Sequence, residues 1–347
     1  MITEDKYFFS VLKERVDRYF LENRLFHTGE HRLYLKSIVQ ILSALLLYII
    51  LVFYTPAWWV GGCLSVILGF NLAALGFNIM HEGGHQSFSK YKWLNSLAGY
   101  FLNVLGGNIY FWKVKHNVNH HTFTNIEGID SDIDVKPFMR LHPSQPHTGI
   151  HRYQHIYWAL LYGISYMAWV FYEDFLKYFS GKIASHMKPM SMSVKEHIIF
   201  WFTKISYVTV AVVIPVIFVG WAKAMLGFLL VTFVCGLFIS IVFQLAHVVE
   251  KAKFPLEKKI AGDWAVHQLS TTSNFATSNK IMFWLLGGLN FQIEHHLFPM
   301  VSHIHYPQIS KLVKETCKEF NVTYHEYATM FDAVISHIMY LRKMGAS

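Results

Sequence analysis

Four long runs without a charged side chain constrain this chain more than any other feature of its sequence. Each run is long enough to cross the roughly 30 Å hydrocarbon core of a bilayer at about 1.5 Å per helical residue. Hydrophobic residues make up 53% of the chain and charged residues only 15%, which is too few charges to cover a soluble surface. We therefore predict four transmembrane helices, over Ser37–Thr55, Ala57–Met80, Ile205–Ala222 and Ala224–Ala246.

The segments between these runs predict how the helices are connected. Only Pro56 separates the first two runs, and only Lys223 separates the last two. Each pair is therefore expected to form a helical hairpin that returns the chain to the side it left. Lys and Arg are concentrated in the remaining polar segments, and the positive-inside bias places such segments in the cytoplasm. We expect both termini and all of the polar chain on that side of a multi-pass membrane protein.

These expectations describe a single all-α membrane domain over residues 1–347. Residues 37–80 and 199–247 are the two hairpins, and residues 81–198 and 248–347 form a His-rich helical cap in the cytoplasm. Residues 1–36 are expected to form a cytoplasmic or interfacial helix, with Phe8, Leu12, Val16 and Phe20 on one face. Three shorter apolar stretches are expected to be interfacial or re-entrant helices: Trp93–Gly107, Tyr157–Phe171 and Ile281–Leu289.

Histidine is unusually abundant, with 21 residues against 22 acidic ones. Box 1, His81 and His85, directly follows the second apolar run, and its i, i+4 spacing places both rings on one helix face. Box 2 repeats this pair and adds a neighbour about 100° round the helix, which could reach a second ion. The histidines of box 2 are His116, His120 and His121, and those of box 3 are His295 and His296.

Seven clustered imidazoles exceed the three or four that one tetrahedral zinc ion needs, so two metal ions are implied. Nitrogen ligands without thiolate suit zinc, copper, iron or nickel. The clusters lie just outside the bilayer, beside acyl chains that offer only strong C–H bonds. Because attack on such bonds needs dioxygen activated by a redox metal, two irons are the chemically sensible inference.

A rival interpretation comes from the same first cluster. His81-Glu82-Gly83-Gly84-His85 also matches the H-E-x-x-H signature of zinc proteases, in which Glu is the general base. Two consecutive glycines each cost roughly 1 kcal/mol in a helix relative to Ala, and a protease leaves boxes 2 and 3 unexplained. Metal analysis distinguishes the two, because two irons per chain contradict one zinc.

Other features exclude some functions and leave two questions open. Asp130, Asp132 and Asp134 begin like a calcium loop but lack its later Gly and Glu, so they either orient box 2 or form a solvated loop. The lysines that flank the fourth run either anchor a helix end or recognise a phosphorylated lipid or thioester carrier, or an acidic electron donor: Lys251, Lys253, Lys258 and Lys259. The net charge of +8 comes without a nucleic-acid motif, so we expect no nucleic-acid partner. Three cysteines without a CxxC motif argue against a disulfide scaffold and against a cysteine metal site.

With these residues in view, the chain resembles the membrane fatty acid desaturases, whose hallmark is three histidine boxes. The resemblance covers nearly all of residues 40–345. Gln292, in place of the first His of box 3, marks the front-end desaturases, and the bacterial Δ6, linoleoyl-type enzymes are the most similar. The resemblance is sharpest in Lys115–Ile126, Gln244–Glu250, Thr271–Asn279 and Asn290–Pro307.

The resemblance implies a set of iron ligands and the partners of the reaction. The ligands would be the seven box histidines together with His247, with Gln292 at or near the site. His267 is expected to support the site rather than to bind metal, and His303 and His305 are not expected to be ligands. There is no His-Pro-Gly-Gly motif of a fused haem domain. The resemblance also implies a bacterial inner membrane as the location.

The sequence thus predicts O2-dependent insertion of a cis double bond into a fatty acyl lipid or acyl thioester. Two non-haem irons are the expected cofactors, and O2 is the co-substrate. No nucleotide-binding motif and no cysteine set for an iron–sulfur cluster are present, so electrons are expected from a separate ferredoxin or small haem-b cytochrome. A di-iron lipid hydroxylase of the same superfamily is the alternative, because the boxes barely encode whether oxygen is retained.

Overall fold

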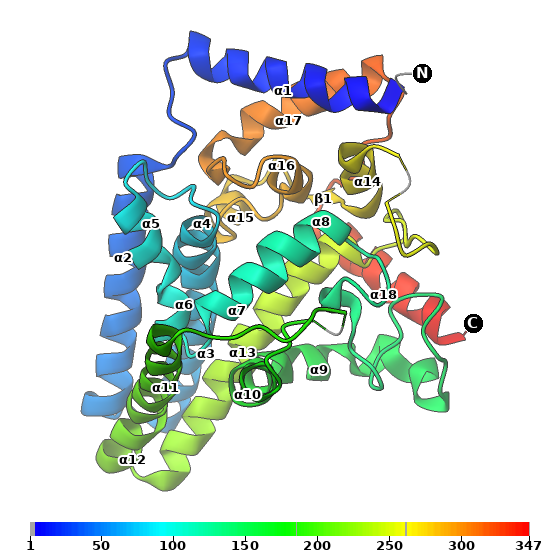
Figure 1. Cartoon of the computed structure of the whole chain (residues 1–347). Coiled ribbons are helices and arrows are strands. Elements are labelled where there is room, and N and C mark those ends of the chain that lie inside the picture. Colours follow the sequence, from blue (N-terminus) through cyan, green and yellow to red (C-terminus); the bar gives the residue numbers. More distant parts are fainter. Residues whose placement is uncertain (1–3, 185, 261, 347) are drawn as a thin grey trace.

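Helices account for nearly all of the regular structure in the computed structural model, which describes residues 4–184, 186–260 and 262–346 (Figure 1). Four helical segments of the described chain are long and apolar enough to cross a membrane: Glu30–Tyr54, Trp58–Gly84, Val194–Val219 and Trp221–His247. The prediction of four membrane-spanning helices is confirmed at this level. Their constituent elements are α2 (Glu30–Ile49), η1 (Ile50–Tyr54), α3 (Trp58–Leu75), η2 (Gly76–Met80), α4 (His81–Gly84), α11 (Val194–Val208), η7 (Thr209–Val213), α12 (Ile214–Val219) and α13 (Trp221–His247).

Two predicted helix ends differ from those in the structure. The helical segment that contains the first predicted span begins at Glu30, before Ser37, and the charged Glu30 has partners in the protein, since it accepts hydrogen bonds from Tyr34 and from the backbone of Lys90. The last two spans separate at Gly220 and not at Lys223. Gly220 has a φ of +81°, which breaks the helix at little cost only for glycine, and the exposed Lys223 lies in the first turn of α13.

Helix α13 is the centre of the helical bundle and packs against α3 and α9 (Gln154–Ala168). Small residues let the backbones approach closely, as is typical of helix pairs in membranes. A Cβ on Gly163 of α9 would lie 2.1 Å from Phe233 Cε2, and one on Gly236 of α13 would lie 2.7 Å from the Gly163 carbonyl oxygen. The two helices could not cross this closely with larger residues at either position.

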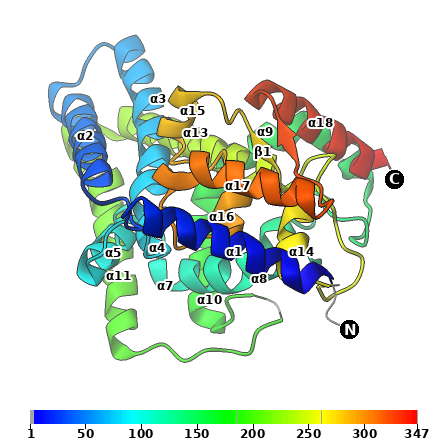
Figure 2. The same ribbon diagram turned by 90° about the horizontal axis from the view of Figure 1, so that it is seen from above.

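Helix α1 (Glu4–Glu22) lies across α17 (Tyr306–Glu319) at the end of the molecule that is uppermost in Figure 1, and Figure 2 shows the two side by side. The predicted apolar face is present, since Phe8, Leu12, Val16 and Phe20 are at most 4% exposed. These side chains pack in one core with residues of α14 (Trp264–Thr271) and α17. This apolar face is therefore covered by protein.

Shorter elements complete the cap around the bundle. The three shorter apolar stretches of the sequence contain most of α5 (Lys92–Gly99), all of α6 (Phe101–Val104), most of α9 and most of α15 (Lys280–Leu285). A two-residue parallel pair, β1 (Asn274–Phe275) with β2 (Glu326–Tyr327), is a small departure from the all-α prediction. The remaining helices are α7 (Ile109–Lys113), α8 (His121–Phe123), α10 (Asp174–Ser180), α16 (Gln292–Leu297) and α18 (Met330–Ala346).

Candidate metal centre

Box 1 lies where the second long helix ends. His81 begins α4 and His85 follows its last residue, and their ring centroids are 4.7 Å apart. The two glycines between them permit close packing: a Cβ on Gly83 would lie 2.4 Å from the Gly99 backbone nitrogen, and one on Gly84 would lie 2.3 Å from Trp112 Cζ3. The helical cost of Gly83 and Gly84 thus has a packing reason, and the predicted pairing of the box 1 rings is present.

Box 2 lies in a π-helical segment, η3 (Val114–His120), which continues into α8. A π-helical turn bonds residue i to i+5, so His116 and His121 stand one turn apart and their Nε2 atoms are 3.2 Å from each other. The i, i+4 pair of His116 and His120 is also close, with ring centroids 5.4 Å apart. The wider turn therefore changes which box 2 histidines face which neighbours.

Two groups consist of histidine alone, and in each the nitrogen atoms lie within 4.8 Å of one another; a third group joins His116 and His120 to Asp132 within the same distance. The first contains His81, His85, His116 and His295, and the second contains His120, His247 and His296. The sequence had suggested His121 as the box 2 residue that reaches a second ion, whereas the structure places His120 in the second group. His121 lies between the groups, with its ring centroid 4.6 Å from that of His295 and 4.4 Å from that of His296.

Most histidines of this cluster have a ring nitrogen without a protein partner. Within the described chain, buried nitrogens of six of these eight histidines make no hydrogen bond, and five of the six are Nε2 atoms: His81, His85, His247, His295 and His296 through Nε2, and His121 through Nδ1. Unpaired buried nitrogens are costly, and here they converge in two places. The residues present therefore fit two metal ions bound by imidazole.

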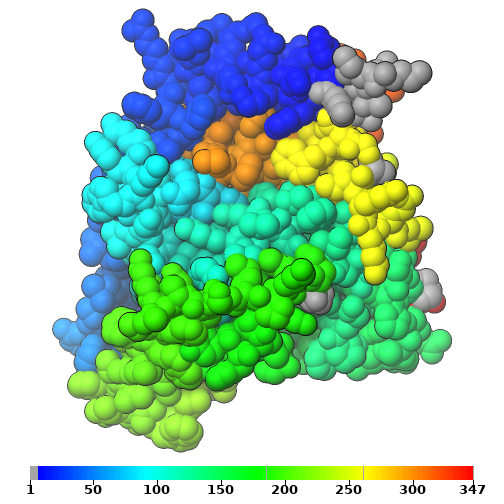
Figure 3. Space-filling model, in the orientation of Figure 1, coloured from blue at the N-terminus to red at the C-terminus, as the bar shows by residue number. Residues whose placement is uncertain are grey.

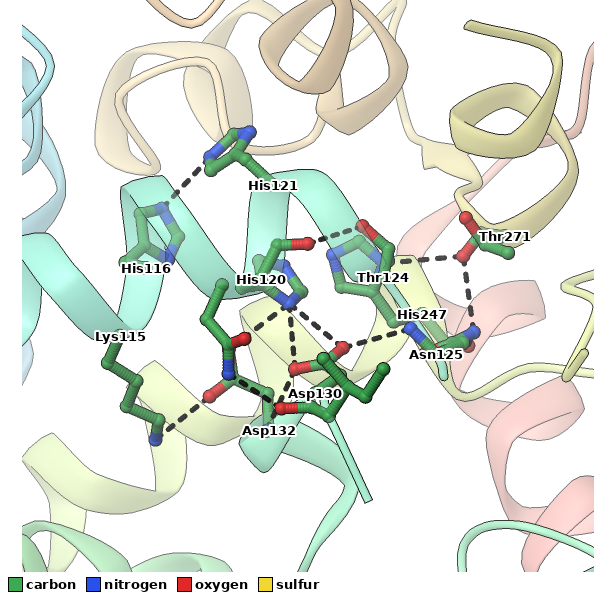
Figure 4. A network of polar contacts seen from close by, with 12 residues as sticks. Lys115, His116, His120, His121, Thr124, Asn125, Asp130, Asp132, His247 and Thr271 are labelled. Atoms are coloured by element: carbon green, nitrogen blue, oxygen red, sulfur yellow. Dashed lines mark hydrogen bonds and ion pairs between the residues drawn. The ribbon is translucent and has the colours of Figure 1, made fainter. Parts of the chain in front are cut away.

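The other ring nitrogen of several histidines is held by a neighbour, as is usual for metal ligands. His120 Nδ1 lies 3.1 Å from Asp130 Oδ2, in the network that Figure 4 shows. His296 Nδ1 lies 2.8 Å from Gln268 Oε1, and His247 Nδ1 lies 3.3 Å from the Thr271 carbonyl oxygen. Each of these contacts orients a ring and leaves its Nε2 lone pair for a metal.

Burial sets the protonation of the cluster. Loss of solvation lowers the pKa of five histidines outside the long helices well below the usual value, so they are neutral and able to bind metal: His85, His116, His121, His295 and His296. His120 differs. Burial also opposes its charged form, but the carboxylates of Asp130 and Asp132 outweigh that effect and raise its pKa. Around His120 the site thus carries compensating negative charge.

The contacts of Asp130 and Asp132 indicate the role of the loop that carries them. Asp130 is 1% exposed, and besides His120 it accepts hydrogen bonds from the backbone of Asn125 and Asp132. Asp132 pairs with Lys115 Nζ at 2.8 Å. Of the two interpretations left open by the sequence, the contacts favour orientation of box 2.

Substitution of Asp130 tests this assignment. Asp130→Asn removes the charge that faces His120 Nδ1 while it keeps the side-chain shape, and we expect metal affinity or activity to fall about 10- to 100-fold. Metal content after dialysis against a graded chelator would measure it. Asp134→Asn, in the same loop but exposed, is the control. Equal metal retention in the two variants would contradict the assignment.

Glu82 is not placed as a zinc protease would require. Its side chain is 3% exposed, and Oε1 accepts hydrogen bonds from His303 Nδ1 at 2.6 Å and from the His303 backbone at 2.9 Å. Oε2 accepts a third from Ser87 Oγ at 2.7 Å. Both carboxylate oxygens are occupied by these partners, so Glu82 is not free to act as a general base for a metal-bound water.

The structure also gives positions for Gln292 in box 3 and for the other histidines that the sequence singled out. Gln292 shares the short helix α16 with His295 and His296, is 1% exposed, and has no hydrogen bond on either amide atom among the described residues. His267 Nε2 lies 3.0 Å from the Thr124 carbonyl oxygen, outside both groups. His303 bonds to Glu82, and His305 packs edge-on against Phe20.

Sequence reasoning missed three groups that touch the rings of the candidate ligands. Gln268 Oε1 contacts His296 and also accepts from Thr124 Oγ1 at 2.9 Å. Tyr306 Oη lies 3.2 Å from His295 Nδ1, and the backbone oxygen of Thr271 contacts His247. Single polar residues carry no spacing signal, so only the fold reveals them.

The whole cluster is enclosed by protein. The box histidines and His247 are all at most 5% exposed. On the face seen in Figure 3, the segments that carry box 2 and α14 form a continuous surface beneath α1. The centre therefore lies inside the molecule, where the long helices end and the cap begins.

Comparison with known proteins agrees with this geometry. The family model described as fatty acid desaturase matches residues 56–328. The sn-1 linoleoyl-lipid 6-desaturase of Arthrospira platensis is 36% identical over 96% of this chain and 91% of that protein, and its namesake in Synechocystis sp. is 33% identical over 99% and 97%. The acyl-lipid (8-3)-desaturase of Physcomitrium patens is 36% identical over 99% of this chain and 72% of that protein. The chain therefore belongs to the fatty acid desaturase family and is an enzyme of that class.

Proposed function

We propose that this enzyme is a front-end desaturase that introduces a cis double bond at the sixth carbon of a linoleoyl-type acyl lipid. The two groups of converging, unpaired histidine nitrogens carry the proposal. The names of the cyanobacterial relatives support the position of the double bond and the lipid substrate. Gln292, the residue that marks front-end enzymes, lies on α16 beside two of the proposed ligands.

We further propose iron as the metal in both groups, with His81, His85, His116, His120, His121, His247, His295 and His296 as ligands and Gln292 at or near the site. When bound, two irons would supply the O2 activation needed to remove hydrogen from an unactivated methylene pair. The reaction balances as one acyl CH2–CH2 unit, O2, two electrons and two protons giving CH=CH and two waters. Imidazole ligation without thiolate is compatible with iron.

The protein's own contribution is to hold this chemistry in place. Asp130, Gln268 and the Thr271 carbonyl fix three of the rings through Nδ1, so the ligands are oriented before metal arrives. Enclosure of the centre keeps water from the reacting carbons. The long apolar helices bring the site to the level where acyl chains begin.

Product analysis tests the function directly. The chain should be expressed in a host that lacks polyunsaturated lipids and fed linoleate. We expect a new triene whose extra double bond is located at the sixth carbon by mass spectrometry, and no such product from cells with the empty vector. A hydroxylated product would instead support the lipid hydroxylase alternative. Absence of any modified acyl chain at normal expression would overturn the proposal.

We also propose that residues 1–347 form one domain with two transmembrane hairpins and with boxes and termini in the cytoplasm, in a bacterial inner membrane. The packing of α2 on α3 and of α12 on α13 supports the hairpins. Residues 1–3 and 347, at the very ends, lie outside the described residues.

Accessibility of the cap tests this topology. Ser144 is exposed in the segment between box 2 and α9. In a Cys63→Ser background, which removes the one exposed cysteine, Ser144→Cys should react with an impermeant maleimide only after the membrane is permeabilised. Labelling in sealed cells would place box 2 outside and contradict the two-hairpin arrangement.

Electrons are proposed to come from a separate acidic carrier, a ferredoxin or a small haem-b cytochrome. The chain has a net charge of +8, and opposite charge accelerates encounter in a salt-dependent way.

Reconstitution tests this requirement. Purified enzyme with substrate and O2 alone should stop after a single turnover, and reduced ferredoxin with its reductase should start multiple turnover, faster at about 20 mM than at about 300 mM salt. Sustained turnover without a carrier would contradict the requirement, and salt-independent rates would remove its electrostatic part.

A further inference from the structure

Helix α2 is polar on its buried face and apolar on its exposed face. Its buried residues are Leu33, Lys36, Ser37 and Gln40, and their i, i+3, i+4, i+7 spacing places them on one side. The outward face is apolar, with Leu35, Ile38 and Leu42 each more than half exposed. Polar residues inside a membrane-spanning helix are expensive and mark functional positions. We call Lys36, Ser37 and Gln40 the α2 polar stripe.

The polar stripe lacks hydrogen-bond partners. Ser37 and Gln40 are 6% and 4% exposed, yet Ser37 Oγ and both amide atoms of Gln40 make no hydrogen bond within the described chain. The Lys36 ammonium has His303 Nε2 at a long 3.4 Å and lies 4.9 Å from the centre of the Trp284 ring. Buried polar groups in native proteins are normally paired, so these side chains point to a ligand.

The stripe is connected to the metal centre by a short chain of contacts. Lys36 contacts His303, whose Nδ1 bonds to Glu82 at 2.6 Å, and Glu82 is the neighbour of His81 in box 1. Trp284, which belongs to α15, lies beside the Lys36 ammonium, and Figure 1 shows α15 level with the upper part of α2. A group bound at the stripe would therefore lie close to box 1, at the membrane end of the site.

The donors of the stripe define the chemistry of its ligand. An ammonium, a primary amide and a hydroxyl together offer several N–H and O–H donors, which match the oxygens of an acyl carbonyl group. In the proposed reaction, that carbonyl is the polar group nearest to the sixth carbon and is only a few bonds from it. We propose that the α2 polar stripe binds the acyl carbonyl of the substrate and so fixes which carbon pair faces the metals.

This inference rests on the proposed function and extends it to the selection of position. Methylenes along an acyl chain are chemically alike, so a front-end enzyme needs a fixed point at the carboxyl end. Glycerolipid esters and CoA thioesters share the carbonyl, and the stripe recognises what they share. Lys36, Ser37 and Gln40 are thus positioning residues for the substrate and do not touch the reacting carbons.

Kinetics and product position together test the stripe. Lys36→Met and Gln40→Leu remove the polar groups and keep most of the side-chain volume. In membranes supplied with sn-1 linoleoyl glycerolipid or with linoleoyl-CoA, we expect KM to rise about tenfold, kcat to change less, and double bonds to appear at neighbouring carbons. Lys36→Arg should keep one product position, and Lys92→Met, at an exposed lysine of α5, should match wild type. The better wild-type substrate identifies the source of the carbonyl.

A binding measurement keeps the test valid if the variants fold poorly. The wild-type protein should be stabilised against heat more by methyl linoleate than by the hydrocarbon that lacks the ester group. Equal stabilisation by the two probes would overturn the inference, as would well-folded variants with unchanged KM and a single product position. If wild type desaturates neither substrate, the proposed function fails; if wild type is active and the variants match it, only the carbonyl site fails.

Discussion

Replacement of His85, His120 or His296 by alanine is expected to abolish desaturation while the chain still inserts into the membrane. His85 belongs to the first histidine group and the other two belong to the second. All three rings are at most 5% exposed, so no solvent ligand can take their place without rearrangement. The loss of activity should exceed the roughly 10- to 100-fold effect of changing a residue that contacts a metal ligand but does not itself bind metal.

Metal content gives this prediction a second readout. His85→Ala should weaken the metal of the first group, whereas His120→Ala and His296→Ala should weaken that of the second. Iron per chain, measured on purified protein together with zinc, would separate the two groups and also decide between iron and zinc. His186→Ala, at an exposed loop position, is the control. Full activity in any of the three variants would remove that residue from the ligand set.

The membrane helices and the clustering of the boxes were predictable because both depend on local sequence. Uncharged runs of sufficient length report spans directly, and i, i+4 spacing brought His81 and His85 together as expected. The errors also have local causes. Gly220 ends a helix through its positive φ, a property that an apolar run hides, and Glu30 begins a helix because distant residues satisfy its carboxylate.

The division of the histidines between two groups could not be predicted in the same way. It depends on the π-helical form of box 2, which brings His116 beside His121 and leaves His120 to join His247 and His296. Periodicity arguments assume an α-helix and therefore pointed to His121 for the second ion, whereas His120 is the box 2 residue that joins the second group. The contacts of Gln268 and Tyr306 arise from packing between segments far apart in sequence, which no motif records.

The α2 polar stripe shows why a prediction from hydropathy alone places the start of this helix too late in the sequence. The predicted span started after Lys36 because a charge was taken to end the hydrocarbon region. In the structure Lys36 points inward, 9% exposed, and the helix continues past it in both directions. A charged residue that faces the protein interior is compatible with a span when it has a function there.

Two histidines outside the boxes are expected to behave in opposite ways when removed. His247 ends α13, and its Nε2 is unpaired within the described chain and lies in the second group. His267 lies outside both groups, and its Nε2 is bonded to the Thr124 carbonyl oxygen. His247→Ala should therefore lower bound iron and eliminate turnover. His267→Ala should retain most of the iron, with activity falling about 10- to 100-fold.

The reason for the smaller effect lies in what His267 holds. Thr124, the residue it bonds to, donates its hydroxyl to Gln268 Oε1, and Gln268 in turn contacts His296. Loss of His267 would loosen the support of one proposed ligand, whereas loss of His247 would remove a proposed ligand. His267→Gln, which keeps an N–H donor, should recover part of the activity, and no such substitution should rescue His247. Iron content and turnover of the variants, measured side by side, decide which of the two substitutions has the larger effect. Iron loss in His267→Ala with retention in His247→Ala would show that the eighth ligand is His267.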